Sequence, residues 1–346
     1  MSLATGDLTR AFARPRSGLG PQRLLAGPKL GSGESWDEHC ARLDGPISDR
    51  LRRVHPDRLI EAVRRSGLRG RGGGGFPTGD KLLAARRHGS GAVVVGNGSE
   101  TEPAAAKDEV LLRLRPHLVL DGLEVAARAL GARGAFLVAP SPAAWDSVTA
   151  ALAERTERHV PLQLIEGPRN FVGGEETAVI RWIEGGPALP RFQPPRVVDR
   201  GWRGLPTLVQ NVETLAHLGL IARLGPEWFA AVGTEAEPGT MLITLSGAVE
   251  RPGVYEVAIG LELTKLLAAA GPDPKAVALL VGGYFGSWLR APQIPGARLS
   301  RAGLAPLAAS PGAGVMHLLS PGSCGLRESH RVADWLAQQG ARQCGP

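Results

Sequence analysis

Short apolar runs alternate with helical segments between residues 91 and 165, and this alternation constrains the fold more than any other feature of the sequence. The runs at 91–97, 135–139 and 161–165 have the length and the β-branched or apolar content of buried strands. Segments 118–130 and 143–155, which separate them, are predicted helices. Strands that alternate with helices pair in parallel, so the sequence predicts a Rossmann-like α/β domain. Further helices are predicted at 56–66, from about residue 80, at 175–183 and at 210–224.

A different pattern begins near Gly233. Residues 240–249 predict a strand and 254–257 its hairpin partner, and a short helix follows at 263–270. This order predicts a small α+β module, and the tail at 324–339 is predicted to be helical. The first residues are rich in Gly, Pro and Arg without periodicity, so we expect a frayed or contact-ordered leader without a functional role. We therefore divide the chain into a leader (1–54), an α/β domain (55–235), an α+β domain (236–321) and a C-terminal helical segment (322–346).

The composition excludes several classes of protein. The net charge is +7, but 33 acidic residues are dispersed among 40 basic ones and the 16 aromatic residues are scattered, so no nucleic-acid partner is expected. Three cysteines, Cys40, Cys324 and Cys344, have no regular spacing, which argues against a disulfide framework and for a reducing cytoplasm. No window approaches the roughly 18 apolar residues of a membrane span. We expect a cytoplasmic protein.

A glycine-rich loop between two predicted helices is the strongest single motif. Seven glycines fall within the thirteen residues from Gly67 to Gly79, and seven basic residues lie between Arg64 and Arg87 against one acid. Backbone N–H groups that turn inward before a helix bind anions, phosphates above all, and Lys81 follows the loop closely. The spacing matches neither the Rossmann fingerprint nor the P-loop. The alternative is a flexible surface turn.

Polar side chains follow three predicted elements. Asn97, Glu100 and Glu102 come at the carboxyl end of a predicted strand, where open α/β sheets bind ligands. Glu175 and Glu176 follow two glycines at a helix start, and Asn211 and Thr214 belong to the segment Pro206–His217, near another helix start. The alternatives are a solvated turn for the first group and capping of the helix dipole for the second.

In this order the motifs resemble those of the FMN-binding, NADH-oxidising F subunit (51-kDa subunit) of respiratory complex I and its relatives in soluble hydrogenases and formate dehydrogenases. The resemblance covers residues 55–344. It rests on GLRGRGGGGFPTGDK from Gly67, on GNGSETEP from Gly96 with the following Lys107 and Asp108, on GGEETA from Gly173 and on PTLVQNVETLAH from Pro206.

The resemblance implies a site for FMN and a site for NAD(H). Residues 239–320 are similar to the ubiquitin-like SLBB domain of that family. The flavin would take a hydride from NAD(P)H and release electrons to a partner, an iron–sulfur subunit or a ferredoxin-like protein. Catalytic roles next to the nicotinamide fall to Glu102 and Glu176. The implied cofactor-binding residues are Gly70, Gly72, Gly73, Phe76, Lys81, Asn97, Glu100, Gly174, Glu175, Asn211 and Thr214.

The chain departs from the family at several positions. Ala84 stands where an aromatic residue is usual, Phe171 replaces a tyrosine, and Gln193 and Arg196 replace a lysine and a phenylalanine that flank a Pro-Pro pair. An altered nicotinamide site is therefore expected. On the flavin side, Ser99 and Gln210 are gentler changes. The alternative function is a degenerate, non-catalytic flavoprotein or an assembly relative.

Relatives hold a [4Fe–4S] cluster through a C-x-x-C-x-x-C run and one distant cysteine. Here Cys344 resembles the opening of such a run, as a remnant cluster ligand in a truncated iron–sulfur region. Three cysteines cannot supply four ligands, so no cluster is expected in this chain. Cys324 is expected to begin the C-terminal helix. The family resemblance also suggests a cytoplasmic location at the periphery of a membrane complex.

Overall fold

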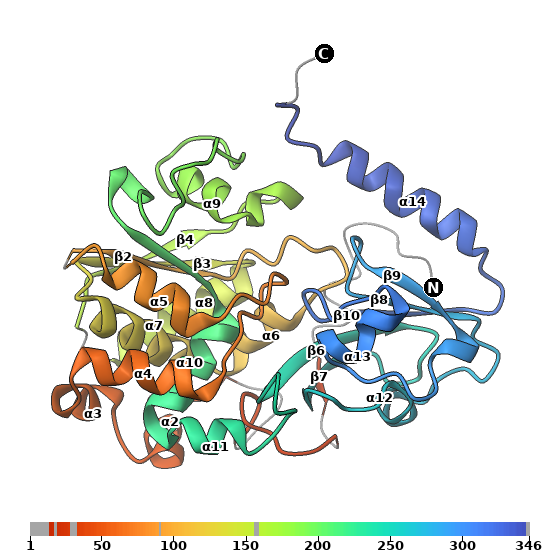
Figure 1. Cartoon of the computed structure of the whole chain (residues 1–346), viewed down its shortest axis with the longest axis horizontal. Helices are drawn as coiled ribbons and strands as arrows, with labels where there is room; N and C mark the ends of the chain where they lie inside the picture. Colours follow the sequence, from red (N-terminus) through yellow and green to blue (C-terminus); the bar gives the residue numbers. More distant parts are fainter. Residues whose placement is uncertain (1–13, 17–18, 28–32, 90, 156–158, 344–346) are drawn as a thin grey trace.

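A computed structural model describes residues 14–16, 19–27, 33–89, 91–155 and 159–343, and it contains two sheets (Figure 1). The first sheet is parallel throughout and has the order β4-β3-β2-β5. Apolar and β-branched residues fill its inner strands, whose side chains are buried on both faces, as expected for a parallel sheet. The strands are β2 (Val93–Asn97), β3 (Gly134–Ala139), β4 (Leu162–Glu166) and β5 (Thr207–Asn211).

Helices cover both faces of this sheet. One face packs on a large core to which α7 and α10 contribute most of their length, and the other face packs on Val179 and Ile180 of α9. The Rossmann-like α/β prediction is confirmed. The helices of this part are α4 (Pro56–Ser66), α5 (Thr78–Arg86), α6 (Lys107–Leu114), α7 (Pro116–Leu130), α8 (Pro142–Glu154), α9 (Glu176–Ile183), α10 (Val212–Leu224) and α11 (Pro226–Ala230), with short 3-10 turns η1 (Phe171–Gly174) and η2 (Trp202–Gly204).

Two parts of the α/β prediction need correction. The helix predicted at 210–224 begins at Val212, and Thr207–Asn211 form a strand that pairs with β2. The short helix α6, which follows the GNGSETEP motif, was not predicted. The strand β5 matters for function, because the chain order of the strands reverses between β2 and β5. Such a switch point is where open α/β sheets bind ligands.

The second sheet belongs to the α+β module. Its order is β1-β7-β6-β10-β8-β9, and the predicted hairpin of β6 and β7 is present. A separate apolar core fills one side of the sheet, including Leu263 and Leu266 of α12. The elements are β1 (Pro15–Arg16), β6 (Thr240–Gly247), β7 (Gly253–Ala258), α12 (Leu263–Ala270), β8 (Ala278–Val281), β9 (Ser287–Arg290), η3 (Ala291–Gln293), α13 (Arg301–Leu304), η4 (Ala305–Leu307) and β10 (Val315–Leu319).

The C-terminal helix α14 (Gly325–Gln338) runs from this module toward α9 of the α/β part (Figure 1). It begins directly after Cys324, which confirms the position expected for that cysteine. Its apolar side packs on the second module, where Val332 is buried beside Tyr284. The four domain boundaries drawn from the sequence remain a prediction.

The region expected to be a frayed leader is structured where it is described. It forms α2 (Trp36–Leu43) and α3 (Ile47–Arg53), and β1 joins the second sheet beside β7. Leu24 and Leu25 are fully buried, and their N–H groups donate to the buried carboxylate of Glu256. The first residues therefore contribute to both cores.

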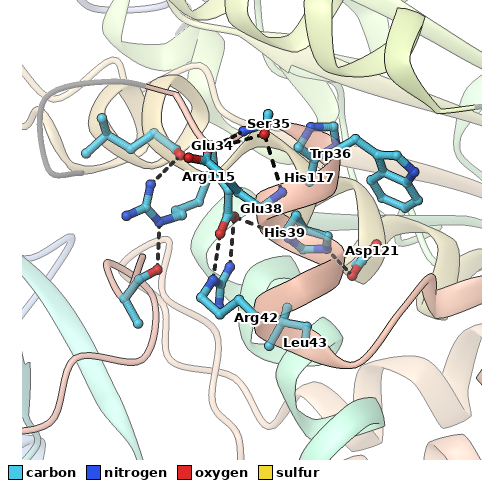
Figure 2. A network of polar contacts seen from close by, with 12 residues as sticks. Glu34, Ser35, Trp36, Glu38, His39, Arg42, Leu43, Arg115, His117 and Asp121 are labelled. Atoms are coloured by element: carbon cyan, nitrogen blue, oxygen red, sulfur yellow. Dashed lines mark hydrogen bonds and ion pairs between the residues drawn. The ribbon is translucent and has the colours of Figure 1, made fainter. Parts of the chain in front are cut away.

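A buried polar network, which we call the N-terminal clamp, fastens α2 to α7 and α10. Figure 2 shows its part around Glu34, His39, Arg42 and Asp121. The clamp consists of Glu34, His39, Arg42, Asp121, Arg155 and Arg223. Nδ1 of His39 lies 3.2 Å from Glu34 and Nε2 lies 2.9 Å from Asp121. Asp121 also accepts hydrogen bonds from Arg155 and Arg223. Every charge in the clamp has a partner of opposite sign or a histidine ring.

Candidate functional site

A cavity of about 570 Å³ opens at the switch point, beside the carboxyl ends of β2 and β5. Its volume is within the range of roughly 300–1,000 Å³ usual for small-molecule sites. Eight of the thirteen predicted site residues line the cavity. These are Gly72, Gly73, Asn97, Glu100, Glu102, Gly174, Glu175 and Asn211.

Two asparagines end the neighbouring strands β2 and β5 side by side. Asn97 and Asn211 are direct partners in the register of β2 and β5. The Nδ2 group of Asn97 donates to the carbonyl of Gly174 at 2.9 Å, which ties β2 to the turn before α9. Asn211 caps α10 by accepting from the N–H of Glu213, and it donates to Asp108 at 2.7 Å. Their amides are thus held in fixed orientations at the cavity edge.

The glycine-rich loop is ordered by contacts at its ends and leaves donors free in its middle. The N–H of Gly70 donates to the carbonyl of Phe76, and the N–H of Arg71 donates to Thr214 Oγ1 at 2.9 Å. Within the described part of the chain no group accepts a hydrogen bond from the amides of Gly72 or Gly73. Gly73 has a φ of +106°, a conformation that a side chain rarely adopts. The middle of the loop therefore lines the cavity and has two backbone amides without an acceptor among the described residues, as an anion site requires.

Arginines from both modules hold this loop in place. The guanidinium of Arg71 is buried and donates to the carbonyls of Pro238 and Thr240, at the start of the second module. Arg301, on α13, donates to the carbonyl of Gly73 at 2.6 Å. The position of the loop consequently depends on how the second module packs.

Lys81 and Glu176 form an ion pair outside the cavity lining. The Nζ atom of Lys81 lies 2.8 Å from Glu176 and donates to the carbonyl of Val209 at 2.9 Å. Phe76, Gly70 and Thr214 also lie outside the lining, and the ring of Phe76 is mostly exposed. The roles predicted for these five residues remain predictions.

Glu175 has the capping role that the sequence left open as an alternative. Its carboxylate accepts hydrogen bonds from the N–H groups of Thr177 and Ala178 in the first turn of α9. It also lines the cavity. Both capping bonds go to Oε2, so the lone pairs of Oε1 remain free and the same carboxylate can also contact a ligand.

Glu100 and Glu102 are carboxylates whose charges are poorly compensated. Glu100 caps α6 by accepting from the N–H groups of Asp108 and Glu109, each at 2.8 Å. Burial, with the neighbouring charge of Asp108, raises the pKa of Glu100 to about 8. Glu102 accepts one N–H bond, from Tyr284 at 3.1 Å, and burial raises its pKa to about 7. Within the described residues no Lys or Arg forms an ion pair with Glu102.

Lys107 places a positive charge at the cavity wall that the prediction missed. Its side chain is only 2% exposed, and its Nζ lies 2.8 Å from both Asp108 and Glu213. Burial alone would lower its pKa, but the two carboxylates outweigh burial and raise it. The sequence marks this lysine, because the Lys107-Asp108 pair after GNGSETEP is part of the family resemblance, but the pair was not predicted to belong to the site.

The second module supplies one wall of the cavity, and this wall was also missed. The residues that it contributes to the lining are Gly282, Phe285, Ser310, Gly312 and Ala313. The sequence predicts a turn at the Gly-Gly pair between β8 and β9. No local pattern, however, connects this turn to the loop that follows β2, nearly 200 residues earlier.

Comparison with known proteins agrees with this geometry. The family model for the Nuo51 FMN-binding domain matches residues 63–219, and the SLBB domain model matches residues 242–277. An NADH-quinone oxidoreductase F subunit of Rhizobium meliloti is 32% identical over 318 residues, which are 84% of this chain and 73% of the relative. The chain belongs to the family of NADH-quinone oxidoreductase F subunits.

Other relatives extend the comparison to hydrogenases. The alpha subunit of the NAD-reducing hydrogenase HoxS of Cupriavidus necator is 32% identical over 308 residues, 80% of this chain and 51% of the relative. A solved structure of an NAD⁺-reducing [NiFe]-hydrogenase in the H₂-reduced state matches with a TM-score of 0.80 and 33% identity, over 88% of this chain and 55% of that one. The chain thus spans between about half and three quarters of the length of these relatives.

The residues at the switch point fit FMN. Free loop amides suit a phosphate, the two asparagines suit hydroxyl groups, and the cavity has the volume of a ligand site. The Nε2 group of Gln210, next to the last residue of β5, is buried without a hydrogen-bond partner among the described residues, but Gln210 does not line the cavity.

The described residues do not fit an iron–sulfur cluster. Among them, no three His, Cys, Asp or Glu side chains gather as metal ligands, and the described cysteines, Cys40 and Cys324, are free. Cys344, the predicted remnant ligand, lies outside the described residues.

No helix in the described ranges combines the length and the apolar character needed to cross a bilayer.

Proposed function

We propose that this chain is an FMN-dependent oxidoreductase that takes a hydride from NAD(P)H and passes electrons to a partner. The observation that carries the proposal is the cavity at the β2–β5 switch point, where free loop amides, two asparagines and Glu102 meet. Membership of the family of F subunits supports the same cofactor. FMN, when bound, would supply the ring that accepts the hydride.

The chain's own residues would bind and orient the flavin. The amides of Gly72 and Gly73, assisted by Lys81, would hold the phosphate, and Asn97 and Asn211 would hold hydroxyl groups. Glu102 faces the cavity from the β2 loop, so it would contact the dinucleotide. Because its raised pKa keeps it partly protonated near neutral pH, it can donate as well as accept a hydrogen bond.

The electron acceptor would be a separate protein, such as an iron–sulfur subunit or a ferredoxin-like protein. The relatives' names describe a subunit of an oxidoreductase and a subunit of a hydrogenase, which supports an assembly of this kind. The scarcity of cysteine supports a cytoplasmic location, at the periphery of a larger complex.

The test is to load the purified protein with FMN and add NADH or NADPH without oxygen. We expect flavin absorbance to copurify or to appear on titration, and the absorbance to bleach with NADH. A protein that takes up no FMN would contradict the proposal at its first step. If the protein binds FMN but neither nucleotide bleaches the flavin absorbance, the chain is a flavoprotein without dehydrogenase activity.

That second outcome describes the alternative function, a degenerate flavoprotein or assembly relative. The specific observation in its favour is where three positions lie at which the chain departs from the family. Ala84 packs against the core, and Gln193 and Arg196 are exposed away from the cavity. Rapid anaerobic bleaching of bound FMN by NADH would exclude this alternative.

A further inference from the structure

The turn between β8 and β9 places an exposed aromatic ring at the cavity. Phe285 is 75% exposed, yet it lines the cavity. Exposed rings of this size are unfavourable in water, and one that borders a concave site is a candidate for contact with a ligand.

The turn is fixed against Glu102. The N–H of Tyr284 donates to the Glu102 carboxylate, and a Cβ at Gly283 would lie 2.8 Å from the Glu102 carboxyl carbon. Gly283 also has a φ of +89°, so both its conformation and its contact require glycine. The ring of Phe285 therefore keeps a defined position next to Glu102.

Neighbouring aromatic rings support Phe285 from behind. Its ring stacks on Phe171, with centroids 5.3 Å apart and planes at 26°. Trp335 of α14 packs edge-on against Phe171 at 5.5 Å and against Tyr284 at 5.1 Å. Gln339, just after α14, accepts a hydrogen bond from the N–H of Phe171. Three distant segments thus build one aromatic wall, which consists of Phe171, Tyr284, Phe285 and Trp335.

The aromatic faces that border the cavity come from this wall. Phe171 and Phe285 line it, whereas Ala84, Gln193 and Arg196 do not. A planar ring that enters the cavity would find its stacking partner on this wall, to which the second module contributes Phe285, and not at Ala84, Gln193 or Arg196.

We propose that Phe285 is a substrate-binding residue that stacks with the planar nicotinamide ring of NAD(P)H. This inference rests on the proposed function and adds a specificity-determining residue from the second module. Offset stacking of aromatic rings contributes free energy beyond simple burial, and the adjacent Glu102 offers a polar group to the edge of the ring. Phe171 and Trp335 act as positioning residues that hold Phe285.

The test compares F285A and F285W with a control, L326A, in the FMN-loaded protein. Leu326 is 80% exposed on α14 and does not line the cavity. The measurements are FMN content by absorbance, the Kd for NAD⁺ by calorimetry, and KM and kcat for anaerobic reduction by NADH. We expect F285A to raise Kd and KM about three- to tenfold, the factor that stacking is worth. F285W should restore both constants, and FMN content should not change.

Each other outcome overturns the inference. If F285A and L326A give the same Kd, the ring does not contact the dinucleotide. Loss of FMN in F285A would assign Phe285 to the flavin site instead of the substrate site. Failure of the wild-type protein to bind NAD⁺ or to react with NADH would reject the proposed function and this inference with it, whereas a reactive wild type with an unaffected F285A rejects the inference alone.

Discussion

Two groups of carboxylates in this molecule, one buried in the N-terminal clamp and one partly buried at the cavity, have opposite electrostatic characters. In the N-terminal clamp, Asp121 accepts from His39 at 2.9 Å, from Arg223 at 2.6 Å and from Arg155 at 2.9 Å. Burial alone would raise the pKa of Asp121, but its contacts with His39, Arg155 and Arg223 outweigh burial and lower it. In the cavity, Glu102 accepts a single backbone N–H bond, and burial raises its pKa to about 7.

The difference separates a structural role from a chemical one. A carboxylate surrounded by partners of opposite charge holds elements together, and a new ligand has no lone pair to use. A carboxylate that is buried, weakly compensated and directed at a cavity is costly to the fold, and such groups concentrate at functional sites. The clamp and the cavity therefore respond in opposite ways to the same type of substitution.

The largest effect is expected in the clamp. D121A would leave Arg155, Arg223 and His39 buried without their common partner, and we expect a loss of about 3–5 kcal/mol in the free energy of unfolding. Denaturant unfolding measures this loss. D146A, which removes an exposed aspartate on α8, is the control and should change stability by less than about 0.5 kcal/mol. If D121A costs no more than D146A, the clamp is not a stabilising network.

The next effect is expected at Glu102, on catalysis and without a loss of stability. E102Q keeps the shape and removes the charge, so kcat/KM for NADH should fall about tenfold to a hundredfold, the value of a hydrogen bond to a charged group. FMN content should stay close to that of the wild type, and the denaturation midpoint at neutral pH should not fall, because the raised pKa of Glu102 makes its charge unfavourable to the fold. E61Q, on the exposed side of α4, is the control. Loss of flavin in E102Q would place Glu102 in the cofactor site.

The ion pair of Lys81 and Glu176 is half-exposed, so its electrostatic environment is intermediate between that of the clamp and that of the cavity. K81A removes a cation that the proposal assigns to the phosphate, so the Kd for FMN should rise about tenfold, as for one charge-assisted hydrogen bond. R87A removes an exposed charge from the residue that follows α5 and is the control. FMN titration followed by flavin fluorescence measures both. Equal losses in the two variants would show that the phosphate binds elsewhere.

Much of the α/β part could be predicted because its signals are local. The helix 56–66 has the predicted bounds, since a proline starts it and Gly67 ends it. The strand β5 could not be predicted, because only Thr207–Val209 read as a strand and the following residues continue a helical pattern. Its conformation is decided by pairing with β2, more than a hundred residues earlier, which no local pattern records.

The residues of the site also divide into those that local sequence signals predict and those that only tertiary packing brings together. Asn97, Glu100 and Asn211 could be found because each follows a strand or begins a helix, where the sequence itself marks a ligand position. The aromatic wall could not be found, because Phe171, Phe285 and Trp335 meet only through the packing of the second module and α14 on the first. The clamp was missed because its helix α2 is short and mostly polar, so hydrophobic periodicity did not reveal it.

The smallest expected effect is a change in how stability depends on pH. Glu102 titrates near 4.5 in the unfolded chain and near 7 in the fold. Between these values the folded state binds more protons at Glu102, so the contribution of Glu102 to the free energy of unfolding should fall as pH rises. Glu34 behaves in the opposite way. Burial opposes its ionisation, but hydrogen bonds from Arg42 and His39 lower its pKa to about 2, so its contribution is lost as pH falls from 4.5 toward 2.

E102Q distinguishes the two limbs of this pH profile. The glutamine does not titrate, so the wild type should lose stability relative to E102Q between pH 4.5 and 7, while Glu100, Glu213 and Glu256, whose pKa values burial also raises, contribute equally to both proteins. The acid limb below pH 4.5 should not change, because Glu102 is protonated in both the folded and the unfolded chain there. Urea unfolding at a series of pH values measures both limbs. If the E102Q and wild-type profiles superimpose, Glu102 is as well compensated as Asp121, and the electrostatic distinction between the clamp and the cavity does not exist.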